Sequence, residues 1–165
     1  MLNNRGWIIQ QIIKLAAVSY SDKYIVIDAD TMLLRSHDYW INGDPVIRRS
    51  NEHGEIYKGF EESIDQAGAD TYICHMGSFN KKINYGYFDY VKNCTNKEWY
   101  EYIVFYLNES DGLYSEWNSI SKYVISMHGY KISHWANKSV DFLSNEKVIV
   151  TNWWRDSLSL HRHDN

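Results

Sequence analysis

The sequence has few of the residues and segments that define special protein classes. It contains a single proline, Pro45, with 44% hydrophobic and 23% charged residues, which excludes a collagen-like, low-complexity or disordered chain. Its two cysteines, Cys74 and Cys94, are too few for a disulfide framework or a structural zinc site. The longest apolar stretches, such as Ile12–Val18, fall far short of the roughly 20 residues that a membrane span needs. We therefore expect a folded chain without a membrane span.

An excess of positive charge and a leader segment are also lacking. The net charge of −4 argues against a general nucleic-acid binder, whose binding surface would be basic. The start MLNNRGWIIQQ does not have the charged, apolar and small-residue regions of a signal peptide, so the expected location is cytoplasmic. No repeat, linker or composition shift divides the chain, which predicts one domain over residues 1–165. Aromatic residues are plentiful at 16%, which suits an amphipathic groove as well as a core.

The N-terminal part of the sequence predicts a helix followed by a strand. Apolar residues at helical spacing predict a helix over Arg5–Tyr20. The apolar run Tyr24–Ile27 has no polar alternation, which is typical of a strand buried on both faces of a parallel sheet. A helix that leads into such a strand is the second half of a βαβ unit, and the first strand of that unit has no counterpart before Gly6.

Further elements follow along the chain. Glu61–Gly68 is predicted to be helical, and Thr71–Cys74 is predicted to be a strand that ends at His75. Ser115 precedes Glu116 as an N-cap and predicts a helix that runs to about Met127. Later strand candidates are Lys131–Trp135, Lys147–Val150 and Leu158–His161. The whole pattern predicts one α/β unit.

Two carboxylates, Asp28 and Asp30, directly follow the predicted strand Tyr24–Ile27. Acids at i and i+2 after a buried strand can point at one spot, and Mg²⁺ or Mn²⁺ takes oxygen ligands of this kind together with substrate phosphates. In open α/β sheets, ligands gather beyond the carboxyl ends of the strands, where this pair would lie. An Asp-x-Asp pattern is common by chance, so the prediction of a metal or phosphate site depends on this placement after an apolar strand.

Two enzyme classes share a strand followed by such a pair. A haloacid-dehalogenase-type phosphatase uses the first Asp as nucleophile and the second as acid/base, with a Thr or Val two places after the second Asp. Here that place holds Met32, Thr31 comes one position early, and no later acidic cluster completes a magnesium site. The other class is the nucleotide-sugar glycosyltransferases, in which the pair holds a metal and a diphosphate.

Five segments in order resemble the DUF6492 family of GT-A-type glycosyltransferases. They are a Gln-Gln-x-x-Lys helix, an acidic pair after a strand, a His-Met segment, a Ser-Glu-aromatic helix start and a late His-x-His. In this sequence they read GWIIQQIIKL (Gly6–Leu15), YIVIDADTMLLR (Tyr24–Arg35), ICHMGSF (Ile73–Phe79), YSEWNSISKYV (Tyr114–Val124) and LSLHRHD (Leu158–Asp164). The resemblance spans nearly the whole chain. It implies a GT-A-like fold with a mixed, mostly parallel sheet flanked by helices and lacking its first strand or strands.

The resemblance also implies roles at the donor side. Asp28 and Asp30 would hold a divalent metal, Mn²⁺ or Mg²⁺, and through it the donor diphosphate. His161 would complete the metal shell, with His163 in reserve, unless both lie in an exposed polar tail. Gln10, Gln11 and Lys14 would reach the donor, with Lys14 as a cation for phosphate. A solvated helix face is the alternative explanation for these three residues.

At the acceptor side the resemblance implies a base and a binding surface. Glu116 would remove the proton of the acceptor hydroxyl, with Asp111 as the alternative base. The alternative is that Glu116 serves only the dipole of its helix, in whose first turn an acid is favourable. His75, Met76 and Trp117 would contact the acceptor, although a histidine or tryptophan in such a position is as often part of a core.

The expected function is therefore a metal-dependent transfer of a sugar from a nucleotide-diphosphate-sugar donor to a glycan or other hydroxyl acceptor. The chain departs from the family at its front, where the strand and loop that cradle the nucleotide are expected. It would then be a fragment, a truncated reading frame or half of an assembled pair, completed by an N-terminal segment or a partner chain. The alternatives are a non-catalytic remnant or binding module and, more distantly, the phosphatase.

Overall fold

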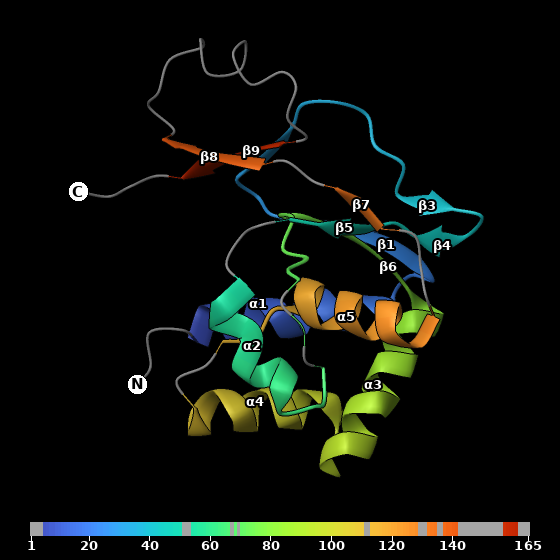
Figure 1. Ribbon diagram of the computed structural model, residues 1–165, viewed down its shortest axis with the longest axis vertical. Helices are drawn as coiled ribbons and strands as arrows, with labels where there is room; N and C mark the ends of the chain where they lie inside the picture. The colour runs from blue at the N-terminus through green and yellow to red at the C-terminus, as the bar shows by residue number, and fades with distance from the viewer. Residues whose placement is uncertain are drawn as a thin grey trace.

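A layer of short strands lies on one side of a group of helices (Figure 1). The computed structural model describes residues 5–50, 54–66, 68, 70–110, 113–128, 132–134, 137–141 and 157–161. The described helices are α1 (Arg5–Ala16), the 3-10 turn η1 (Ala17–Ser19), α2 (Gly54–Glu62), α3 (Lys81–Thr95), α4 (Trp99–Glu109) and α5 (Glu116–His128). None of them is both long and apolar enough to cross a bilayer, within the part of the chain that is described.

The described strands form four small sheets. Strand β1 (Lys23–Ile27) pairs antiparallel with β6 (Met76–Asn80), and β3 (Trp40–Ile41) pairs antiparallel with β4 (Asp44–Pro45). Strand β5 (Ile47–Arg49) pairs parallel with β7 (Ile132–His134). Strand β9 (Ser157–His161) lies between β2 (Thr31–Leu33), antiparallel, and β8 (Asn137–Asp141), parallel. The chain is thus a mixed α/β structure.

The expectation of a mostly parallel sheet is wrong for the described residues, because three of the five pairings among the described strands are antiparallel. The strand at Tyr24–Ile27 exists, but it is not buried on both faces: its three central residues are half-buried and Ile27 is 43% exposed. Its neighbour β6 runs the opposite way, and an antiparallel pair tolerates one open face. The continuous apolar run therefore led to a prediction of deeper burial than this strand has.

Two of the helix predictions are confirmed and one is wrong. Helix α1 with η1 confirms the helix over Arg5–Tyr20, and the Ser115 hydroxyl accepts from the backbone N–H of Asn118 at 3.4 Å, which confirms the predicted N-cap of α5. The predicted helix over Glu61–Gly68 is wrong, because α2 ends at Glu62 and turns follow it. The predicted strand Thr71–Cys74 is also wrong, since regular pairing begins only after His75, at Met76. Lys147–Val150 lies outside the described residues.

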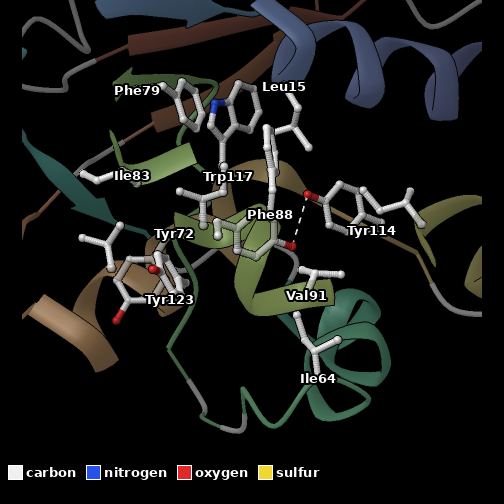
Figure 2. Close-up of a cluster of buried hydrophobic side chains, with 14 of the residues drawn as sticks. Leu15, Ile64, Tyr72, Phe79, Ile83, Phe88, Val91, Tyr114, Trp117 and Tyr123 are labelled. Carbon is white, nitrogen blue, oxygen red and sulfur yellow. Dashed lines mark hydrogen bonds between the residues drawn. The ribbon is translucent and has the colours of Figure 1, made fainter. Parts of the chain in front are cut away.

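An aromatic core joins the helices to the strands (Figure 2). The ring of Phe60 from α2 meets the ring of Tyr114 edge-on at 4.5 Å, and Phe88 from α3 stacks on Trp99 from α4, also at 4.5 Å. The hydroxyls of Tyr87 and Tyr114 lie 3.4 Å apart in the interior, and burial raises the pKa of both phenols well above the ordinary range. Much of the high aromatic content is thus used in packing rather than in an open groove.

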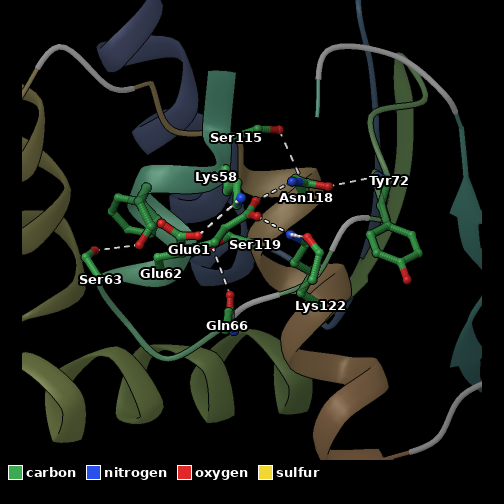
Figure 3. Close-up of polar contacts among 12 residues, drawn as sticks. Lys58, Glu61, Glu62, Ser63, Gln66, Tyr72, Ser115, Asn118, Ser119 and Lys122 are labelled. Atoms are coloured by element: carbon green, nitrogen blue, oxygen red, sulfur yellow. Dashed lines mark hydrogen bonds and ion pairs between the residues drawn. The ribbon is translucent and has the colours of Figure 1, made fainter. Parts of the chain in front are cut away.

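A buried polar network ties α2 to α5 (Figure 3). The Glu61 carboxylate is 1% exposed and accepts from both the Asn118 amide and the Lys122 ammonium. Asn118 in turn accepts from the backbone N–H of Tyr72 at 2.8 Å, and Lys122 donates to the carbonyl of Gly68 at 2.9 Å. The network fixes the start of α5, where Glu116 lies, against α2 and against the segment that leads to His75.

Candidate functional site

Four of the five sequence segments described above meet at one point. Lys14, in the last turn of α1, places its Nζ atom 3.0 Å from Oδ1 of Asp28 and 3.0 Å from Oε1 of Glu116. Asp28 directly follows β1, and Glu116 is the first residue of α5. Helices α1 and α5 lie next to each other beneath these strands (Figure 1). We call Lys14, Asp28, His75, Glu116 and Trp117 the Lys14 cluster.

His75 is the second partner of Asp28. Its Nδ1 atom lies 3.5 Å from Oδ2 of Asp28, and its carbonyl accepts from the backbone N–H of Asp28 at 2.9 Å. His75 has a φ of 56°, in the left-handed region that non-glycine residues seldom adopt. Burial opposes the charge of Asp28, but the contacts with His75 and Lys14 outweigh it and lower the pKa of Asp28. Asp28 is therefore held as a carboxylate between two nitrogen donors.

Glu116 is enclosed. Its side chain is 1% exposed, and burial raises its pKa from the ordinary 4.5 to about 7, although the nearby Lys14 works in the opposite direction. The ion pair with Lys14 is close, yet neither carboxylate oxygen of Glu116 accepts a well-aligned hydrogen bond from the described residues. A carboxylic acid that titrates near neutral pH has the proton affinity of a general base. The oxygens of Glu116 could also accept hydrogen bonds from a ligand, as the acids of binding sites do.

Trp117 covers the ammonium group. The Nζ atom of Lys14 lies 4.1 Å from the centroid of the Trp117 ring, a cation–π contact in a nearly closed position, since Trp117 is 6% exposed. The ring also lies 6.5 Å from that of His75. Gly77, in β6, leaves the room that the indole occupies, because a Cβ atom there would clash with Cδ1 of Trp117. The glycine after the His-Met pair was not singled out in the sequence, and its position beside that pair is the signal that was available.

We expect Gly77→Ala to destabilise the fold by about 1–3 kcal/mol, because the added methyl group must displace the packed indole of Trp117. Gly6→Ala is the matched control: a Cβ there meets nothing within 4 Å, so it should change stability by less than about 1 kcal/mol, and in the stabilising direction for a helix. Urea denaturation of the two variants measures both effects. Equal midpoints for Gly77→Ala and the wild type would contradict the packing argument.

The other donor-side candidates lie around the cluster. The carbonyl of Asp28 accepts from the backbone N–H of Thr31 at 3.0 Å, which closes a tight turn that carries the half-buried Asp30. Gln11 is 2% exposed, and its carbonyl oxygen has no hydrogen-bond partner in the described part of the chain, whereas Gln10 is exposed on α1. Burial of an unpaired amide oxygen is costly, which makes Gln11 the better candidate of the two for a ligand contact.

The remaining candidates are less well placed or lie outside the description. Met76 is 1% exposed and packs with Cys74 in a small apolar cluster, so it does not face an open acceptor surface. His161 ends β9, but its side chain is not among the described ones. Asp111 and His163 lie outside the described residues. Their predicted roles stay predictions.

The described side chains offer only part of a metal coordination shell, so the remaining ligands would come from substrate and water. Among the described side chains, no group of three or more His, Cys, Asp or Glu residues gathers as in a closed metal centre. Asp28 and Asp30 together offer two carboxylates at one turn. This set fits Mg²⁺ or Mn²⁺, which bind through one or two carboxylates and take their other oxygens from phosphates and water.

Comparison with known proteins adds no family to these observations. No protein-family model matches the chain, and no curated protein or solved structure matches it. The site is therefore described by its own geometry: a lysine held between two carboxylates, one of them kept ionised by an imidazole and the other buried.

Proposed function

We propose that this chain is a glycosyltransferase of GT-A type that moves a sugar from a nucleotide-diphosphate-sugar donor to a hydroxyl acceptor with Mn²⁺ or Mg²⁺. The observation that carries the proposal is the convergence on Lys14, whose ammonium lies 3.0 Å from both Asp28 and Glu116. Residues 14, 28, 75 and 116 are distant in the sequence, and each belongs to a different segment of the resemblance. Unrelated surface residues would have no reason to meet in one partly buried cluster.

In this proposal the sugar donor binds where acidic and basic side chains lie close together. Asp28 and Asp30 would hold the cation, which when bound offsets the negative charge of the departing nucleotide. Lys14 supplies a positive charge, and Gln11 supplies a buried amide oxygen that no described residue pairs with; both lie on α1. A diphosphate needs cationic partners, and a ribose or sugar hydroxyl can donate to an amide oxygen.

Glu116 is the base in this proposal. Its pKa of about 7 suits the removal of a proton from an acceptor hydroxyl near neutral pH. Because its side chain is only 1% exposed, the acceptor hydroxyl must enter the Lys14 cluster to reach it. Asp111 remains the alternative base.

The test is hydrolysis of UDP-sugars and GDP-sugars by the full chain in the presence of Mn²⁺. We expect Asp30→Ala to lower the rate about a hundredfold or more, since the loss of a metal ligand removes several kcal/mol of charge stabilisation. Asp22→Ala is the matched control, because Asp22 precedes the other end of β1 and is 86% exposed in its side chain. Its rate should equal that of the wild type.

Other results would support the other functions. If no nucleotide sugar binds at millimolar concentration, the glycosyltransferase proposal fails and a non-catalytic binding module is favoured. Release of phosphate from a generic phosphoester, with trapping at Asp28 by a phosphate mimic, would indicate the phosphatase instead.

A further inference from the structure

We propose that Lys14 is an internal counter-cation of the site: it occupies Asp28 when no divalent ion is bound, and it withdraws to Glu116 when one binds. The inference rests on the proposed function for the presence of a divalent ion at Asp28. It adds a competition between two cations for one carboxylate. It also assigns Glu116 the task of receiving the displaced lysine, and while the lysine is held there Asp111, the alternative base, would take the acceptor's proton.

Both carboxylate oxygens of Asp28 have a nitrogen neighbour in the structure. Its Oδ1 atom has the Lys14 ammonium at 3.0 Å, and its Oδ2 atom has Nδ1 of His75 at 3.5 Å. A Mg²⁺ or Mn²⁺ ion binds a carboxylate oxygen at about 2.1 Å, well inside the distance that the ammonium keeps. Since the side chains of Asp28 and Lys14 are only 20% and 11% exposed, water screens the repulsion between the two cations poorly. An ion can take Asp28 only if the ammonium moves away.

Lys14 has a second position ready. Oε1 of Glu116 already lies 3.0 Å from its Nζ atom, and no described residue gives either oxygen of Glu116 an aligned hydrogen bond. The Trp117 ring lies 4.1 Å from the same ammonium and would stabilise it on the Glu116 side. A lysine carries its charge on a flexible stem with three rotatable donors, so a small rotation exchanges one carboxylate for the other. No charge is left unpaired by the exchange.

Mn²⁺ alone is the probe, with free Mn²⁺ measured by electron paramagnetic resonance on the full chain. We expect Lys14→Met to bind Mn²⁺ at least about tenfold more tightly than the wild type, because the competing cation is gone. Lys81→Met is the matched control: Lys81 pairs with Asp22 at the opposite end of β1, and its side chain is 52% exposed. That variant should bind as the wild type does. The double variant Lys14→Met/Glu116→Gln also removes the buried acid that loses its partner, and it should keep the tighter binding if the single variant does not fold.

Each outcome decides the proposal. Equal or weaker Mn²⁺ binding by the Lys14 variants overturns it, while the proposed function still stands if Asp30→Ala abolishes Mn²⁺ binding. Failure of the wild type and of every Lys14 variant to bind Mn²⁺ overturns both this inference and the metal dependence of the proposed function. Tighter binding by the Lys14 variants and unchanged binding by Lys81→Met is the result that supports the exchange.

Discussion

Lys122→Met is expected to lower the free energy of unfolding by about 3–5 kcal/mol at pH 7.5, because it leaves a buried charge without its partner. Glu61 is 1% exposed, and the Lys122 ammonium is its only cationic partner among the described residues. Burial already raises the pKa of Glu61 above its ordinary value, with Lys122 and Asn118 working against the shift. Removal of the ammonium raises it further, so the variant should be less damaged at pH 5 than at pH 7.5.

A matched pair of residues provides the control. Lys58 and Glu62 also form a lysine–glutamate pair on α2, at 3.5 Å, but both side chains are about half exposed. Lys58→Met should therefore cost less than about 1 kcal/mol. Guanidinium denaturation of both variants, and of the double variant Glu61→Gln/Lys122→Met, measures the difference. If the double variant is no more stable than Lys122→Met alone, the buried charge is not the cause of the loss.

This contrast also shows why the sequence predicted some features and not others. Glu61 and Glu62 are adjacent acids in a polar stretch, and nothing in the local pattern says that one is enclosed and the other 53% exposed. The burial of Glu61 depends on Asn118 and Lys122, which lie more than fifty residues away. Local rules also misplaced α2. The turn after Glu62 is closed by the hydrogen bond from the backbone N–H of Gln66 to the carbonyl of Glu61 at 2.8 Å, with Asp65 at a φ of 57°, and no glycine or proline marks this end in the sequence.

The candidate site was predictable to the extent that it depends on local signals. An apolar strand followed by two acids predicted the position of Asp28 after β1, and Ser115 before Glu116 predicted the position of Glu116 at the start of α5. The pairing of β1 with β6 places His75 against Asp28, and that antiparallel partner was not predicted. Pairing between distant strands is set by the packing of the whole chain, so an apolar run alone does not reveal the direction of its neighbour.

Glu116 should make the stability of the fold depend on pH in the neutral range. Its pKa rises from 4.5 to about 7 on folding, a shift of about 2.5 units that corresponds to about 3 kcal/mol. A raised pKa means that the folded state binds the proton more tightly than the unfolded chain does. The stabilising contribution of the proton is therefore complete below pH 4.5 and is lost as the pH rises through 7.

Glu116→Gln should remove this pH dependence of the free energy of unfolding. Between pH 5 and pH 8.5 we expect the wild type to lose about 2–3 kcal/mol of unfolding free energy relative to Glu116→Gln, since the glutamine does not titrate. Urea denaturation of both proteins at several pH values gives the difference directly, and the shared titration of the other carboxylates cancels in it. Glu62→Gln, at an exposed position on the same protein, should follow the wild type across the whole range. A parallel course for the wild type and Glu116→Gln would mean that Glu116 is already ionised throughout, held so by Lys14. In that case the acid would be a fixed counter-charge for the lysine rather than a group able to accept the acceptor's proton.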